Sequence, residues 1–286
     1  MIGVTDQRTS KIMVTVRKTM SKEQSKTFEA IVISLRKHKE KDALVKLFTL
    51  EHGKRMFFIR NLFKANHSLK SALLPFTYST FEGTVQADGL SFLRDYKDSR
   101  NFRKIHEDIY LNAYATYISN LSDAAIEDRV INRELFTLLL DSLEAMEEGQ
   151  DAEIIVNIFE MNMLHYFGVH PDLASCRVCG SQVEPFDYSA RFSGVLCSHH
   201  FHEDPNRLHI NPAAIYFARL FLKIKPHQVK DITIKAENKK AIREFIDFLY
   251  DEYVGIRLKS KSYIDQMYEW EKILEETLVK KKESDE

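Results

Sequence analysis

The repeat of apolar residues along the chain changes near Asn101, and this change constrains the fold more than any other feature. From Thr27 to Tyr96, apolar residues fall in short runs rich in β-branched and aromatic side chains, which is typical of strands. After Asn101 they recur at intervals of three and four, which predicts amphipathic helices. Because 286 residues exceed the usual size of a single hydrophobic core, we expect a strand-rich domain followed by a helical one.

Five short strands are predicted in the first part, separated by turns such as Glu51-His52-Gly53 and Asp88-Gly89. Five strands in so short a segment favour a small closed barrel, since closure removes exposed sheet edges. Residues 61–74 do not resemble a strand and would form a long crossing connection. The predicted strands are 28–35, 43–49, 55–60, 77–85 and 90–96.

Apolar stripes of helical spacing follow, and we assign them to the core of an all-α domain. Gly168 and Pro171 are expected to end the third helix, and Asn211-Pro212 has the composition of a helix start. The predicted helical segments are centred on 105–121, 135–143, 154–164, 212–222, 241–253 and 263–278.

The predicted domains are a disordered extension over residues 1–26, a barrel over 27–100 and a helical domain over 101–286. The extension is polar, and translation could start at Met1 or at Met20; the sequence leaves both open. No apolar run approaches the roughly 20 residues that cross a bilayer, and the first residues do not resemble a signal peptide. We therefore expect a cytoplasmic protein without a membrane partner.

All three cysteines lie within 22 consecutive positions and form the most specific pattern in the chain. Two residues separate Cys176 from Cys179, and Cys197 begins the run Cys197-Ser-His-His200. Two turns of this spacing supply four tetrahedral ligands of the kind that Zn²⁺ prefers. An odd number of cysteines also suits a metal better than a disulfide framework. We predict a Zn²⁺ site formed by Cys176, Cys179, Cys197 and His200, in a finger over residues 173–205.

The fourth ligand is the open part of this prediction, because His199 and His202 are close enough to compete with His200. Sulfur-rich tetrahedral ligation also fits iron, and the simplest alternative is three thiols that cluster without a metal. Four ligands leave no open position for a substrate, so we expect the metal to staple its loop rather than to catalyse. A metal-dependent hydrolase is the corresponding catalytic alternative.

Charge is distributed unevenly, although the whole chain has a net charge of only −1. Residues 36–70 contain ten basic and three acidic residues, a net of +7, whereas residues 121–160 contain two basic and eleven acidic residues, a net of −9. This contrast indicates a basic binding module joined to an acidic one, and solvated surface is the alternative for either run. The basic residues that we predict to contact nucleic-acid phosphates are Arg36, Lys37, Lys39, Lys41, Lys54, Arg55, Arg60, Lys64 and Lys70.

We place Arg36, Lys37, Lys39 and Lys41 in the first loop between strands. Phe57, Phe63 and Tyr78 are candidates either for stacking on bases or for the core of the barrel. Binding through phosphates would tolerate any sequence and would depend strongly on salt. The alternative function is a scaffold whose basic face contacts a protein or an RNA.

The chain has no GxxxxGK[ST] loop, no GxGxxG after a strand, no HExxH and no GxSxG. Because no motif proposes a catalytic constellation, the sequence favours a binding protein rather than an enzyme.

With its parts in this order, the chain resembles the RecO family of bacterial recombination mediators between Thr27 and Trp270. The family's late helical segment is matched by Arg257-Leu258-Lys259-Ser260. The most specific match is Phe167-Gly168-Val169-His170-Pro171-Asp172-Leu173 leading into Cys176. Weaker matches are Glu29-Ala30-Ile31-Val32-Ile33, Leu47-Phe48-Thr49 with Gly53, Leu73-Leu74-Pro75-Phe76, Tyr117-Ile118 and Leu135-Phe136. The chain departs from the family's four-cysteine pattern at His200.

The resemblance implies an α+β protein, with an N-terminal OB-fold barrel and an all-α C-terminal domain into which a zinc finger is inserted. It implies a non-catalytic DNA repair and recombination mediator of the RecF pathway, cytoplasmic and associated with the nucleoid. Such proteins bind single- and double-stranded DNA, anneal complementary strands, work with RecR, and help RecA replace single-strand-binding protein.

Overall fold

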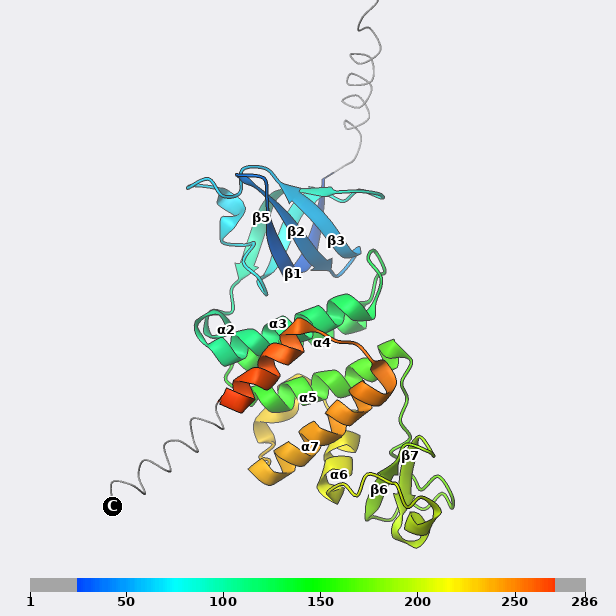
Figure 1. Ribbon diagram of the computed structural model, residues 1–286. Coiled ribbons are helices and arrows are strands. Elements are labelled where there is room, and N and C mark those ends of the chain that lie inside the picture. Colours follow the sequence, from blue (N-terminus) through cyan, green and yellow to red (C-terminus); the bar gives the residue numbers. More distant parts are fainter. Residues whose placement is uncertain (1–24, 271–286) are drawn as a thin grey trace, which may run out of the picture. The chain divides into compact units, whose positions relative to one another are not determined.

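The computed structural model of the protein describes residues 25–270 (Figure 1). The predicted extension lies outside these residues except for its last two positions, as do the alternative starts at Met1 and Met20 and the predicted helix end at Leu278. Contacts within the chain divide it into two compact units between Arg100 and Asn101. The first unit is a barrel and the second is mainly helical, which confirms the predicted α+β class.

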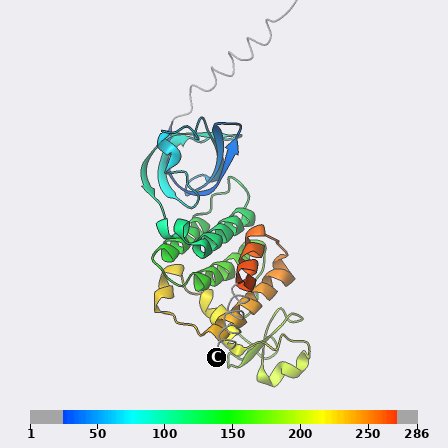
Figure 2. The ribbon, with the colours of Figure 1, turned by 60° about the vertical axis from the view of Figure 1, so that its left-hand side comes forward.

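The first unit is a closed barrel with the strand order β1-β2-β3-β5-β4, visible as a ring in Figure 2. β3 and β5 are parallel, and the other neighbouring strands are antiparallel. Every strand therefore has two partners, as the closed-barrel prediction requires. The strands are β1 (Lys26–His38), β2 (Asp42–Thr49), β3 (Gly53–Ile59), β4 (Tyr78–Thr84) and β5 (Ser91–Arg100).

Alternate residues of the strands fill the barrel. The ring of Phe28 lies 5.6 Å from that of Phe57 and 6.3 Å from that of Phe81, measured between ring centroids. The crossing connection contains a short 3₁₀ turn, η1 (Ser68–Lys70), and places the buried Leu69 and Leu73 against this cluster. Phe57 is thus a core residue and is not available to stack on a base.

β1 is longer than the sequence predicts, and this corrects the placement of two basic residues. Arg36 and Lys37 pair with Leu44 and Ala43 of β2, so they lie on a strand and not in the first loop. Only residues 39–41 form the turn. Charged residues on the solvent face of a paired strand resemble a polar loop in sequence, which explains why Arg36 and Lys37 were predicted to lie in one.

Four helices of the second unit begin where a short polar side chain caps them. Asp108, Asn132, Asp151 and Asn211 each accept a hydrogen bond from a backbone N–H of the first turn that follows. The helices are α2 (Arg103–Glu107), α3 (Ile109–Ala125), α4 (Arg133–Glu147), α5 (Ala152–Met163), α6 (Pro212–Phe221), α7 (Ala236–Leu249) and residues 259–270.

α5 lies among the other helices and is buried along most of its length. It continues as a 3₁₀ turn, η2 (Leu164–Phe167), which ends at Gly168 in the left-handed conformation with φ 75°. α7 continues as a π-helical turn, η5 (Tyr250–Val254), where the sequence predicts one uninterrupted helix. Another 3₁₀ segment, η4 (Pro226–Asp231), contacts α4 and α5.

Among residues 25–270, no helix combines the length and the apolar character that crossing a bilayer requires.

Candidate metal centre and nucleic-acid interface

The cysteine segment forms a finger around a two-stranded hairpin of β6 (Phe186–Ser189) and β7 (Gly194–Cys197). A 3₁₀ turn, η3 (Ser198–Glu203), follows directly and contains His200. The chain before Cys176 runs alongside the hairpin, because Asp172 pairs with Gly194. A Cβ atom at Gly194 would lie 2.7 Å from the Asp172 carbonyl oxygen and 2.8 Å from Cδ of Arg177, so the close approach requires glycine.

The first pair of cysteines is held in a tight turn. The Cys176 amide donates to the Ser181 carbonyl, and the Gly180 amide donates to the Cys176 carbonyl, both at 2.8 Å. Gly180 has φ 72°, which glycine adopts without strain. The Arg177 amide donates to the Val195 carbonyl at 2.9 Å and fixes this turn against β7. The first ligand turn is therefore positioned by backbone contacts.

The four predicted ligands converge. Their ligand atoms all lie within 4.8 Å of one another, and this is the one such group of three or more found among residues 25–270. Cys179 Sγ is 3.8 Å from Cys197 Sγ, and Nδ1 of His200 is 3.3 Å from Cys197 Sγ and 3.7 Å from Cys176 Sγ. A tetrahedral site with Zn–S bonds of about 2.3 Å separates its sulfur atoms by about 3.8 Å. The group could therefore hold one metal ion of that size.

The protonation of the thiols fits metal binding as well. Burial raises the pKa of Cys176, but hydrogen bonds from the backbone of Cys197, Cys179 and Val178 outweigh it and lower that pKa to about 6. Burial and the hydrogen bonds with Cys176 and Cys179 raise the pKa of Cys197. One thiol thus ionises readily while its neighbour retains its proton, and a cation would favour ionisation of both.

Of the three candidate histidines, His200 is the one in this group of ligand atoms. His199 is exposed, and Nε2 of the exposed His202 lies 3.4 Å from a carboxylate oxygen of Glu203. The neighbouring segments are anchored by buried carboxylates. Asp187 accepts from the amides of His209 and Ile210 and pairs with Arg207 at 2.9 Å, so polar contacts stabilise the finger.

Seven of the nine predicted phosphate-binding residues are exposed in the barrel. Two contacts bring their segments together at one end of it. The amide of Phe63 donates to the Lys41 carbonyl at 3.1 Å, and the amide of Asn61 donates to Asp42 Oδ1 at 2.8 Å. Six of the exposed residues, which we call the basic end, are Arg36, Lys37, Lys39, Lys41, Arg60 and Lys64; the seventh, Lys70, lies on η1.

Lys54 and Arg55 do not belong to this exposed set. Lys54 is only 1% exposed, so a phosphate cannot reach its side chain in this structure. Arg55 is half-buried and donates to the carbonyl oxygens of His52, Gln86 and Ala87. The positive charge of Arg55 thus joins two loops of the barrel, a role that sequence spacing does not reveal.

The aromatic candidates for base stacking also differ in exposure. Phe63 is 39% exposed. Tyr78 is half-buried and donates to Glu29 Oε2 at 2.5 Å. The sequence reasoning missed Phe58 and Phe92, whose rings lie 6.5 Å apart between centroids on neighbouring strands. The alternation of buried and exposed residues in β3 was the signal that could have revealed Phe58.

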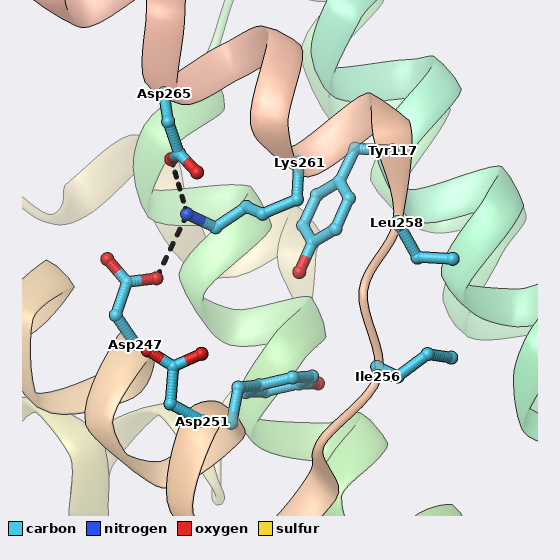
Figure 3. A pocket seen from close by; sticks show the side chains of 8 residues that line it. Tyr117, Asp247, Asp251, Ile256, Leu258, Lys261 and Asp265 are labelled. Carbon is cyan, nitrogen blue, oxygen red and sulfur yellow. Dashed lines mark hydrogen bonds and ion pairs between the residues drawn. The ribbon is translucent and has the colours of Figure 1, made fainter.

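The second unit also contains a cavity of about 240 Å³ beside α7, η5 and the helix of residues 259–270 (Figure 3). The ammonium of Lys261 lies 3.0 Å from Asp247 and 2.5 Å from Asp265. These ion pairs join the helix of residues 259–270 to α7. The lining residues are Tyr117, Asp247, Tyr250, Asp251, Ile256, Leu258, Lys261 and Asp265.

Together these features define a class of protein: a closed five-stranded barrel with a basic end, followed by a helical unit that carries a Cys₃His finger. Comparison with known families identifies the member. Residues 20–102 match the family model described as Recombination protein O N terminal, and residues 106–262 match Recombination protein O C terminal. The chain belongs to the RecO family, which confirms the resemblance found in its sequence.

Individual relatives agree. A DNA repair protein RecO from Enterococcus faecalis is 48% identical over 255 residues, which are 89% of this chain and 97% of the relative. One from Lactococcus lactis subsp. cremoris is 45% identical over 86% of this chain and 97% of its own. One from Streptococcus gordonii is 43% identical over 88% of this chain and 96% of its own.

Proposed function

We propose that this protein acts in DNA repair and recombination by binding DNA through the basic end of its barrel. The observation that carries the proposal is the gathering of six exposed basic residues, from two segments that hydrogen bonds join, at one end of a RecO-family barrel. Each lysine or arginine that meets a phosphate releases a counterion, and this release drives binding without reading sequence.

The same charges account for annealing. Two DNA strands repel each other through their phosphates, and bound lysine and arginine side chains reduce that repulsion. Base pairing then selects the partner strand. No bond is made or broken, so the proposed activity is non-catalytic and extends to both single- and double-stranded DNA.

The remaining assignments follow the family. We assign residues 27–100 to DNA binding and residues 101–286 to a helical domain with a finger at 173–205. The proposed partners are RecR and single-strand-binding protein, with RecA acting on the strand that is released, in the cytoplasm and at the nucleoid. The proposed cofactor is one structural Zn²⁺ held by Cys176, Cys179, Cys197 and His200.

A charge-reversal experiment tests the DNA contact. Lys39, Lys41 and Lys64 are replaced together by glutamate, and binding to single- and double-stranded oligonucleotides is measured by fluorescence anisotropy. We expect affinity for both to fall by at least about tenfold, because phosphate contacts are lost. Reversal of Lys223, Lys235 and Lys240, which are exposed in the second unit, changes net charge equally and is the control. Equal losses in both variants would contradict the proposal.

The alternative is a scaffold for a protein or an RNA. Salt titrations against DNA and RNA single strands of equal length distinguish the two. The proposal requires DNA to bind at least as tightly as RNA throughout the titration, whereas a preference for RNA would favour the scaffold.

A further inference from the structure

A row of side chains crosses the outside of the barrel next to the basic end. Arg36 of β1 pairs with Leu44 of β2, Leu44 pairs with Phe58 of β3, and Phe58 pairs with Phe92 of β5. Directly paired residues point to the same face of a sheet. One arginine, one leucine and two phenylalanines therefore lie side by side over four strands.

This row faces outward. In β3 the side chains of Phe57 and Ile59 are buried in the barrel, and Phe58 between them is only half-buried. Phe92 is 37% exposed. Because successive residues of a strand point to opposite sides, Phe58 and Phe92 belong to the outer surface and not to the core.

The rings are also held in place. Phe58 lies 6.5 Å from Phe92 with an angle of 80° between the rings, and 6.0 Å from His38 with an angle of 84°. Edge-to-face contacts of this kind are favourable and restrict ring motion. His38 ends β1, immediately before the turn that carries Lys39 and Lys41. Fixed aromatic surface and positive charge are thus adjacent.

We propose that Phe58 and Phe92 form a platform on which the bases of a single strand stack while its phosphates contact the basic end. The inference rests on the proposed DNA binding and specifies its preferred substrate. Aromatic rings stack on any base, and an unpaired strand has base faces to offer. In a duplex those faces are already stacked on one another. The platform therefore favours single strands over duplexes, whereas the phosphate contacts favour neither.

An abasic strand isolates the stacking contribution. A thymine oligonucleotide and an abasic oligonucleotide of equal length carry the same phosphates, and anisotropy at one salt concentration gives the affinity ratio of the two. We expect the full-length protein to bind the thymine strand at least about tenfold more tightly, as stacking on two rings implies. The Phe58→Leu, Phe92→Leu variant keeps apolar volume but loses the rings, and its ratio should approach one.

Two controls separate this inference from the proposed function. Tyr216→Leu alters an exposed ring of α6 in the second unit and should leave the ratio unchanged. The Lys39, Lys41 and Lys64 reversal should weaken both oligonucleotides by the same factor. If the leucine variant keeps the wild-type ratio while the reversal still weakens binding, the platform is wrong and DNA binding stands. If the wild type binds neither oligonucleotide, the proposed function itself fails.

Discussion

Glu160, in the middle of α5, is a completely buried carboxylate whose partners come from three other segments. Arg243 of α7 donates to it at 2.5 and 3.2 Å, and the Tyr117 hydroxyl donates at 2.6 Å. The Tyr250 hydroxyl donates to the backbone carbonyl of the same residue at 3.0 Å. A buried charge is tolerated only when it is paired, so this group fixes how α3, α5 and α7 pack.

Arg243→Ala should therefore destabilise the helical unit strongly. Leaving the Glu160 carboxylate buried without its cation is expected to cost about 3–5 kcal/mol. Urea unfolding followed by circular dichroism measures the loss. Lys240→Ala removes an exposed partner of Glu244 from the same helix and should cost less than about 1 kcal/mol. Similar losses in the two variants would show that the buried pair does not hold the helices.

Tyr78 makes a corresponding contact in the barrel. Burial and the hydrogen bond to Glu29 raise the pKa of its hydroxyl to about 12. In the unfolded chain a tyrosine has a pKa of about 10. Since the folded state holds the proton more tightly, this contribution to stability is complete below pH 10 and is lost as the pH rises towards 12.

The free energy of unfolding, measured at pH 9 and pH 11, tests whether stability falls as the pH rises. Tyr78→Phe should lose less stability over this interval than the wild type, because the variant has no proton to release at that position. Glu29→Gln removes one of the causes of the raised pKa and should fall between the two. A variant that loses as much as the wild type would contradict the assignment.

At the scale of elements, the finger depends on side chains that come from two turns separated in sequence. β6 and β7 contain only four residues each, and buried polar contacts such as Asp187 with Arg207 supply much of the surrounding order. The hairpin is buried, and the ring of Tyr188 lies 5.2 Å from that of Phe245 in α7. Metal binding would add to this packing by joining the two ligand turns, and would so contribute to the folding of the finger. The helices beside it have their own apolar core.

We expect one zinc ion per chain by elemental analysis, and Cys197→Ser should abolish it. The far-UV signal of the helices should survive, because most of their buried apolar residues pack against other helices and not against the finger. His200→Ala should weaken zinc binding strongly, while His199→Ala and His202→Ala should not. His200→Cys should retain the metal, since a thiolate at this position supplies the same number of ligands. Retention of full affinity in His200→Ala would assign the fourth ligand elsewhere.

At the scale of the whole molecule, a net charge near zero conceals a positive end on the barrel. Residues 36–70 have a net charge of +7, and residues 121–160 have a net charge of −9. If the protein binds DNA as proposed, long-range attraction to DNA is confined to one part of the chain. Screening by salt weakens such attraction, so ionic strength should govern binding.

The salt dependence gives the number of phosphates that the basic end contacts. For a single strand, each phosphate contact makes the slope of log K against log salt concentration more negative by about 0.7. Reversal of Lys39, Lys41 and Lys64 should make this slope shallower by about 2, whereas the leucine variant of Phe58 and Phe92 should leave it unchanged. A slope that does not respond to the lysines would place the DNA elsewhere.

Local patterns in the sequence predicted the barrel, the helices and the metal ligands, because each depends on neighbours along the chain. Strand and helix periods report which face is buried, and cysteine spacing reports a ligand turn. Two of the errors share a cause. Arg36 and Lys37 looked like loop residues and lie on a strand, and Lys54 looked exposed and is buried. Both depend on which segments pack together.

The sequence by itself determined the two-part architecture, the RecO resemblance and the three cysteines of the candidate metal site, since short-range chemistry is sufficient for each. Only the tertiary structure selected His200 from three histidines, removed Lys54 from the basic surface and aligned Phe58 with Phe92. The physical reason is that each of these features depends on distances between atoms of segments that are separated in the sequence. Such distances are set by the packing and register of whole strands and helices.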